Sequence, residues 1–345
     1  MTESSVLPQA EPGPATPRDW IKILANYREP NQLRSAFELA ISIIPFFLLW
    51  ALAWWSLSIS YWLTLAISVL NAAFLVRLFA IQHDCGHGAF FSNRLVSDWI
   101  GRIIGVVTLT PYDVWRRTHS VHHSTSGNLD KRGMGDVHTL TVSEYQDLSA
   151  FQRLVYRLYR NPVTLFGVGP GYLFFLQNRI PLGLMRGGAK YWVSAMGTNF
   201  AILVALTVIW YFGGLMPVLL IFLPSTLIAG SAGVWLFYVQ HQFEKTRWNA
   251  EEDWQLHDAA LNGSSHYVLP SVLQWFSANI GIHHVHHLYS RIPFYRLTEV
   301  LRDHTELAKG NRLTIRESLT CARLHLWDEK TKRLLSFAQA RTLYG

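Results

Sequence analysis

The sequence predicts an all-α integral membrane protein in which four transmembrane helices, arranged as two hairpins, carry a histidine-rich helical cap on their cytosolic side. Three observations lead to this prediction. Half of the residues are hydrophobic and only 15% are charged, below the roughly 25% usual in soluble domains. Four apolar stretches are long enough to cross a bilayer. The basic residues and the clustered histidines lie outside these stretches or at their ends.

The four apolar stretches define the predicted spans. They cover residues 36–55, 61–80, 192–212 and 215–239, each close to the roughly 20 residues that a helix needs to cross a bilayer. Very short segments join the first stretch to the second and the third to the fourth, so the spans form two helical hairpins. Residues 1–18 are rich in proline and poor in residues that could form a core. They are expected to be a disordered tail, followed by a single domain over residues 19–345.

Basic residues predict the orientation of the spans. Of the 30 Lys and Arg residues, 29 fall in residues 1–35, 81–190 and 241–345, and none falls in the two short turns. Because segments rich in Lys and Arg stay in the cytoplasm, these three segments are expected to face the cytosol, at the inner membrane if the protein is bacterial. The remaining Arg77 lies near a predicted helix end, from which its side chain could snorkel to water. The topology thus accounts for the net charge of +7, and no nucleic-acid partner is expected.

Two shorter apolar stretches, residues 99–109 and 163–177, are expected to be interfacial or re-entrant. The first is too short to span and contains Arg102, and glycines and a proline interrupt the second. A crossing at residues 163–177 would also place the histidine clusters on opposite sides of the membrane.

Three histidine clusters lie in the segments assigned to the cytosol. They are His83 and His87; His119, His122 and His123; and His283, His286 and His287. Residues three and four apart share a helix face, so each cluster is expected to project its imidazoles to one side. Eight imidazoles are more than a single zinc ion uses and suit two ions. Imidazole binds zinc, copper, iron and nickel, and the count favours a pair of redox-active iron ions.

His241 is a ninth candidate ligand, because it lies where the fourth span reaches the cytosol and an ionisable residue at that depth is a functional candidate. His284 lies off the HxxHH pattern and is excluded, as are the isolated His138, His257, His266, His304 and His325. Metal-bound histidines usually donate their second ring nitrogen to a carboxylate or carbonyl. The candidate partners are Asp84, Glu244, Asp113 and Asp136, and Asn279 could hold a water near a metal.

The three clusters, which read HDCGH, HSVHH and HHVHH, resemble the three histidine boxes of membrane fatty acid desaturases. The segments PYDVW at 111–115, FYVQHQFE at 237–244 and NIGIHHVHHLYSRIP at 279–293 extend the likeness, which is closest to acyl-lipid desaturases of the delta-12 (omega-6) type. Gly88 and His266 depart from the pattern of that type without touching the ligand set.

The resemblance implies a helical membrane domain under a cytosolic cap that holds two iron ions. The implied ligands are His83, His87, His119, His122, His123, His241, His283, His286 and His287. It further implies an oxidoreductase that uses O2 to introduce a double bond into an acyl chain of a membrane lipid. Since the sequence contains no His-Pro-Gly-Gly haem-binding signature, electrons are expected from a separate donor, either ferredoxin-like or haem-containing.

Two other readings of the same residues stay open. A hydroxylase or ketolase acting on alkyl or carotenoid substrates would use the same site and add oxygen to carbon. A membrane metal-binding or transport protein would bind the metal without turnover, although the predicted spans carry almost no polar ligands. A zinc hydrolase fits less well, because it needs only three protein ligands and an open position.

Overall fold

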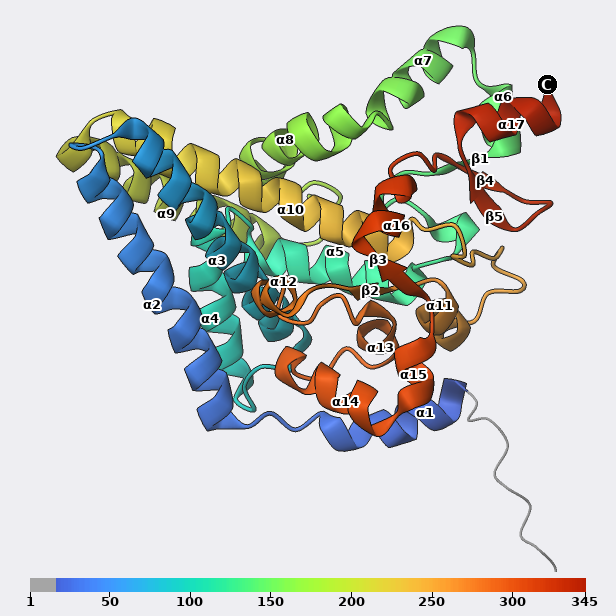
Figure 1. The fold of residues 1–345 in the computed structure, drawn as a ribbon, viewed down its shortest axis with the longest axis horizontal. Helices are drawn as coiled ribbons and strands as arrows, with labels where there is room; N and C mark the ends of the chain where they lie inside the picture. The colour runs from blue at the N-terminus through green and yellow to red at the C-terminus, as the bar shows by residue number, and fades with distance from the viewer. Residues whose placement is uncertain (1–16) are drawn as a thin grey trace, which may run out of the picture.

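The computed structural model describes residues 17–345, and most of these residues are helical (Figure 1). Four helices are long and apolar enough to cross a membrane. They are α2 (Gln32–Ser56), α3 (Tyr61–His87), α9 (Ala189–Gly213) and α10 (Leu223–His241), the last preceded by the π-helix η5 (Val218–Phe222). The four predicted spans are thus confirmed as helices. The predicted tail, residues 1–18, falls almost entirely outside the described residues.

Polar side chains cap the first turns of α2 and α3. Asn31 accepts a hydrogen bond from the backbone N–H of Arg34 at the start of α2, and Ser60 does the same for α3, as side chains at this position commonly do. Helix α3 continues seven residues past the predicted end at residue 80 and stops at Gly88, whose φ of 69° is left-handed. The first histidine cluster therefore belongs to the same continuous helix as the second span.

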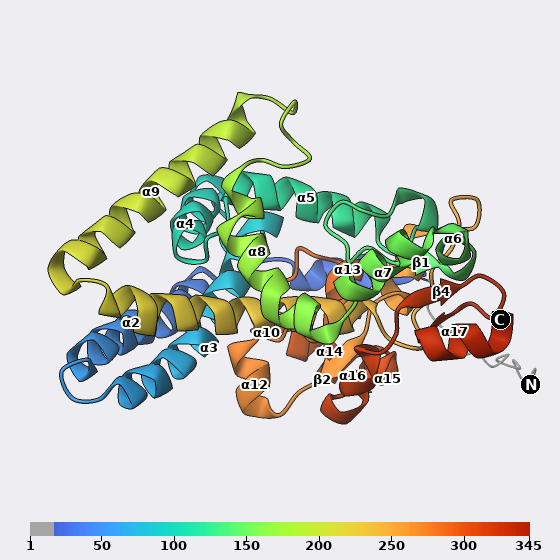
Figure 2. The same cartoon turned by 90° about the horizontal axis from the view of Figure 1, so that it is seen from above.

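Helix α3 is the centre of the fold and contacts α2, α4 (Arg94–Val107) and α10. Half of the residues in the most hydrophobic part of α3 are buried (50%), whereas only 11% are buried in the corresponding part of α9. Figure 2 shows α9 standing away from α10 except near the turn that joins them. At its other end α9 contacts α4 and α5 (Tyr112–Thr125). Most of the surface of α9 is therefore apolar and uncovered by protein.

Arg77 does not reach water, contrary to the prediction. It is 1% exposed and forms an ion pair with Glu38 of α2. Its guanidinium also lies over the ring of Trp275, 3.9 Å from the centroid. Because α3 extends to His87, Arg77 lies inside the helix bundle instead of near its end, and a carboxylate from the neighbouring span compensates its charge.

Shorter elements surround one end of the long helices. The helices are α1 (Pro17–Leu24), α6 (Val142–Asp147), α7 (Ala150–Tyr159), α8 (Gly169–Phe175), α11 (Leu256–Asn262), α12 (Ser271–Phe276), α13 (His283–Leu288), α14 (Leu297–Asp303), α15 (Thr305–Lys309), α16 (Ile315–Cys321) and α17 (Phe337–Tyr344). A π-helix, η3 (Thr164–Val168), joins α7 to α8, and the 3-10 turns are η1 (Ala25–Tyr27), η2 (Leu129–Lys131), η4 (Gln177–Arg179) and η6 (Phe294–Arg296). In Figure 1 the last third of the chain lies at the end of α10 that carries His241.

Two small sheets correct the all-α prediction. β1 (Leu140–Thr141) pairs in parallel with β4 (Leu326–Asp328), which pairs antiparallel with β5 (Arg333–Leu335). β2 (His266–Val268) pairs in parallel with β3 (Arg312–Thr314). With two or three residues each, these strands are too short for an alternating pattern to reveal them. They tie the last residues of the chain to the loops that follow α5 and α10.

Candidate metal centre

Four helices present the nine histidines predicted as ligands. His83 and His87 lie on the last turns of α3, and His241 is the last residue of α10. His119, His122 and His123 lie on α5, and His283, His286 and His287 on α13. The left-handed φ of Gly88 ends α3 directly after His87, and a side chain there would come within 2.4 Å of the Arg94 guanidinium. This accounts for a glycine at the position where the sequence departs from the delta-12 pattern.

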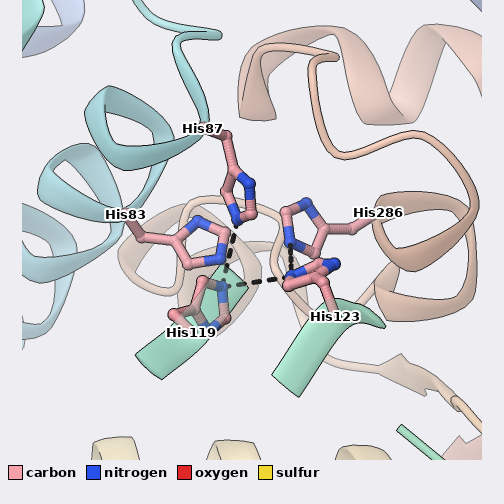
Figure 3. Close-up of side chains that lie close together, drawn as sticks. All are labelled: His83, His87, His119, His123 and His286. Atoms are coloured by element: carbon pink, nitrogen blue, oxygen red, sulfur yellow. Dashed lines mark hydrogen bonds between the residues drawn. The ribbon is translucent and has the colours of Figure 1, made fainter. Parts of the chain in front are cut away.

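The nine imidazoles form two groups, in each of which one nitrogen per ring lies within 4.8 Å of the others. One group holds His83, His87, His119, His123 and His286, and the other holds His122, His241, His283 and His287. Figure 3 shows the five rings of the first group converging from α3, α5 and α13. The structure thus brings together every histidine predicted as a ligand.

Each HxxHH cluster is divided between the two groups. The prediction that all imidazoles of one cluster project to one side is therefore wrong. On α5, His119 and His123 join the five-histidine group and His122 joins the other. The two outer residues are four apart and therefore share a face, since about 100° of rotation separates successive helical residues. The middle histidine of the motif, three residues after the first, is rotated away by about 60° or more and faces the second group. Helix α13 repeats this division with His283 and His287 on one side and His286 on the other.

Within each group the Nε2 atoms face one another. His87 and His119 approach to 3.0 Å through these atoms, and His241 and His283 likewise approach to 3.0 Å. The Nε2 of His287 is buried and has no hydrogen-bond partner among the described residues. Inward-facing ring nitrogens, one of them without a partner, are the donor set that metal cations bind.

Burial favours the neutral form of five of the nine imidazoles, and the neutral form is the one that binds a metal. Desolvation, followed by repulsion between neighbouring rings, lowers the pKa of each of these groups well below 6.5: His119, His123, His283, His286 and His287. A metal ion needs a deprotonated ring nitrogen. No proton therefore has to leave these rings before an ion binds near neutral pH.

Two carboxylates accept hydrogen bonds from Nδ1, the ring nitrogen that faces away from the centre, of two of the histidines. Asp136 accepts a hydrogen bond from His122 Nδ1 at 2.5 Å, and Asp84 accepts one from His83 Nδ1 at 3.2 Å. The second oxygen of Asp84 accepts the backbone N–H of Phe294 at 2.7 Å. Each carboxylate fixes the orientation of its imidazole, so that Nε2 points inward.

Gly135 allows Asp136 to reach His122. It has a φ of +81°, and an added Cβ would lie 3.1 Å from the Cβ of His122 and 3.1 Å from the carbonyl oxygen of Thr118. The loop therefore passes close over α5, at a distance and with a backbone conformation that favour glycine. Asp136 is one of the four carboxylates predicted as partners of the histidines, and only the fold distinguishes it from the other three.

The other predicted partners lie elsewhere. Glu244 is exposed, and no hydrogen bond among the described residues joins it to a histidine. Asn279 donates to the carbonyl oxygen of Phe294 at 3.0 Å, and Asp113 accepts from Arg102 at 3.0 Å. The excluded His284 has its Nε2 2.8 Å from the carbonyl oxygen of Leu307 and belongs to neither group. Trp115, which sequence reasoning did not single out, stacks on His119 with centroids 4.6 Å apart.

A cavity of about 1000 Å³ lies against both histidine groups. His83 and His119 of one group and His283 of the other line it, together with mostly apolar residues of α3, α8 and α10. An apolar chain in this cavity would lie beside both groups.

The fold and the cluster define a membrane protein built around a histidine centre that fits two metal ions. The family model for fatty acid desaturases matches residues 59–318, and the chain belongs to this family of oxidoreductases. The chain is 45% identical over 317 residues to a fatty acid desaturase of Bacillus subtilis, covering 92% of this chain and 89% of the relative.

Cyanobacterial relatives are more distant. An sn-1 acyl-lipid omega-3 desaturase (ferredoxin) of Synechocystis is 28% identical, over 80% of this chain and 76% of the relative. An sn-1 oleoyl-lipid 12-desaturase of Anabaena variabilis is 26% identical, over 81% of this chain and 79% of the relative. The predicted family resemblance is confirmed, and the Anabaena relative suggests the delta-12 type.

Proposed function

We propose that the protein is an O2-dependent di-iron desaturase that introduces a double bond into an acyl chain of a membrane lipid. The observation that carries this proposal is the apolar cavity that touches both histidine groups. The delta-12 (omega-6) position is the first to test, because one relative is named an oleoyl-lipid 12-desaturase.

In this proposal the five-histidine and four-histidine groups each hold one iron ion. Bound iron supplies the redox chemistry with O2 that removal of hydrogen from an unactivated methylene requires. No side chain acid or base could remove so weakly acidic a hydrogen. The four-histidine group offers one protein ligand fewer than the other, and so leaves more room for a further ligand.

The protein's own residues bind and orient the reactants. Trp115, Phe79 and Phe237 line the cavity near the histidines and would hold one carbon–carbon bond beside the centre, where fixed geometry lowers the barrier. Asp84 and Asp136 hold two of the imidazoles in place from behind. The apolar walls would keep bulk water from the reacting carbons.

The proposed topology places the four long helices in the bilayer as two hairpins, with residues 81–190 and 241–345 on the cytosolic side. The distribution of Lys and Arg supports this orientation. Residues 19–345 would then form one domain, which lies in the inner membrane if the protein is bacterial. The acyl chain would enter from the bilayer without leaving it.

A separate protein is proposed to supply the electrons. Ferredoxin appears in the names of two relatives, which favours a ferredoxin-like donor over a haem protein. Loss of two hydrogens from the chain and reduction of O2 to two waters require two electrons and two protons from outside.

The fatty acid profile of a host that expresses the chain tests this proposal. Gas chromatography with mass spectrometry should show a new unsaturated chain, and the mass spectrum would locate its double bond. His122→Ala and His286→Ala should each abolish the product while the protein still inserts into the membrane. A product heavier by one oxygen would instead indicate a hydroxylase or ketolase. Full activity in either variant would contradict the ligand assignment.

A further inference from the structure

One face of α10 forms a continuous wall of the cavity, and its side chains change in size along the helix. The residues on this face are Thr226, Ala229, Gly230, Gly233, Val234, Leu236, Phe237 and Gln240. Near His241 they are bulky, and farther from the centre they are small. The cavity therefore extends along α10 away from the histidines as an arm, and small residues form the α10 side of its distal part.

Gly233 leaves open space in this wall. An added Cβ at Gly233 would have no heavy atom within 4 Å. At Gly230, one turn away, an added Cβ would meet the ring of Phe174 at 3.0 Å and Pro170 at 3.3 Å. Gly230 therefore serves the close contact between α10 and α8, whereas no such contact requires a glycine at 233.

At a position that lines the cavity, a glycine without a packing reason points to a role in the cavity, because glycine weakens a helix interior relative to alanine. The φ of Gly233 is not left-handed, so the backbone conformation does not require it either. What the missing side chain provides is room in the cavity.

The position of Gly233 on α10 defines its distance from the histidine centre along the helix axis. It precedes His241 by eight residues on one helix, which at 1.5 Å per residue is about 12 Å along the axis. An extended acyl chain advances about 1.3 Å per carbon, given a carbon–carbon bond near 1.5 Å. A chain running along α10 would thus reach Gly233 roughly nine carbons beyond the oxidised bond.

We propose that Gly233 determines how much acyl chain can extend past the metal centre, and so sets the upper limit of substrate chain length. This inference rests on the proposed desaturase function. A side chain at 233 would enter the arm and meet the distal part of a long chain, while shorter chains would end before it.

The test compares Gly233→Leu with Gly197→Leu. Gly197 is also helical with no heavy atom within 4 Å of an added Cβ, but it lies on α9 and does not line the cavity. Each variant is expressed in a host supplied with saturated and monounsaturated fatty acids of graded length. Conversion is measured by gas chromatography with mass spectrometry, and iron per purified chain is measured beside it.

For Gly233→Leu we expect the longest converted chain to shorten by at least two carbons. Conversion of the longest wild-type substrates should fall about tenfold or more, the range that a single misfitting methylene produces. Shorter chains and the iron content should stay near wild-type values, as should all values for Gly197→Leu. Gly233→Ala, a smaller change, should give an intermediate shift and serves if the leucine variant does not accumulate.

An unchanged chain-length profile in Gly233→Leu would overturn the inference, as would an equal loss for all lengths with iron retained. If the wild-type protein converts no acyl chain while holding iron, the proposed function itself fails. The two failures are therefore distinguishable.

Discussion

Removal of the Asp136 carboxylate should weaken one metal position and spare the other. Asp136 accepts from His122 Nδ1 at 2.5 Å and is 20% exposed. Two other rings of the four-histidine group have weaker or no hydrogen bonds at Nδ1. His241 Nδ1 lies 3.4 Å from both Ser126 Oγ and the carbonyl oxygen of Gly263, and His283 Nδ1 has no partner among the described residues. The orientation of this group therefore depends strongly on Asp136.

The expected size of the effect follows from this dependence. Loss of such a hydrogen-bond partner typically weakens metal affinity 10- to 100-fold, or about 1.4 to 2.8 kcal/mol. Asp136→Ala should therefore lose iron from the four-histidine group in a chelator titration and keep the ion of the five-histidine group. Iron per chain should fall from two towards one.

The assay is iron per chain by mass spectrometry after graded chelator, with Mössbauer spectra to distinguish the two environments. Asp136→Asn, whose amide oxygen can still accept from Nδ1–H, should retain part of the affinity. Asp147→Ala, at an exposed carboxylate, should behave as wild type. Equal chelator resistance in wild type and Asp136→Ala would refute the reasoning.

Two further predictions concern the scaffold. Arg77→Met removes the buried partner of Glu38 and should cost about 3–5 kcal/mol of stability, seen as a lower melting temperature in detergent. Arg34→Met, at the exposed partner of the same carboxylate, should cost less than about 1 kcal/mol. Equal melting temperatures of the two variants would contradict a structural role for the buried pair. Burial lowers the pKa of His325 to about 4, below its ordinary value near 6.5. Below pH 6.5 the unfolded chain then binds more protons than the folded one. The free energy of unfolding should therefore decrease as the pH is lowered from about 6.5 to 4, by about 2 kcal/mol at pH 5. His325→Phe, which keeps a ring stacked on Phe337, should lose less of its melting temperature between pH 7.5 and 5 than wild type does, and an identical loss would remove His325 as a cause.

Local rules were sufficient to predict much of the site. The four spans follow from hydropathy and length, because a bilayer imposes both. Eight of the nine histidines follow from their spacing on helices, and His241 follows from its place at the end of a span. These signals depend only on neighbours in the sequence, so one sequence reveals them.

The remaining features depend on contacts between distant residues. Glu38 compensates Arg77 from 39 residues away, so the sequence left Arg77 to be explained by snorkelling. The division of each HxxHH cluster between two groups depends on how α5 and α13 face each other. Asp136 was one of several carboxylates until the loop through Gly135 placed it against His122. The β1–β4 and β2–β3 pairings join residues more than 40 apart, and these strands are too short to show a pattern.

The most direct test of the central claim is the mass of the acyl product formed by the purified, iron-loaded protein under 18O2 with a reduced ferredoxin. The account predicts a product lighter than the substrate by two hydrogens, free of 18O, with the label recovered in water. A product that carries 18O on carbon would contradict desaturation, and an unaltered acyl chain in the presence of bound iron, O2 and a competent donor would contradict an oxidative role for the centre.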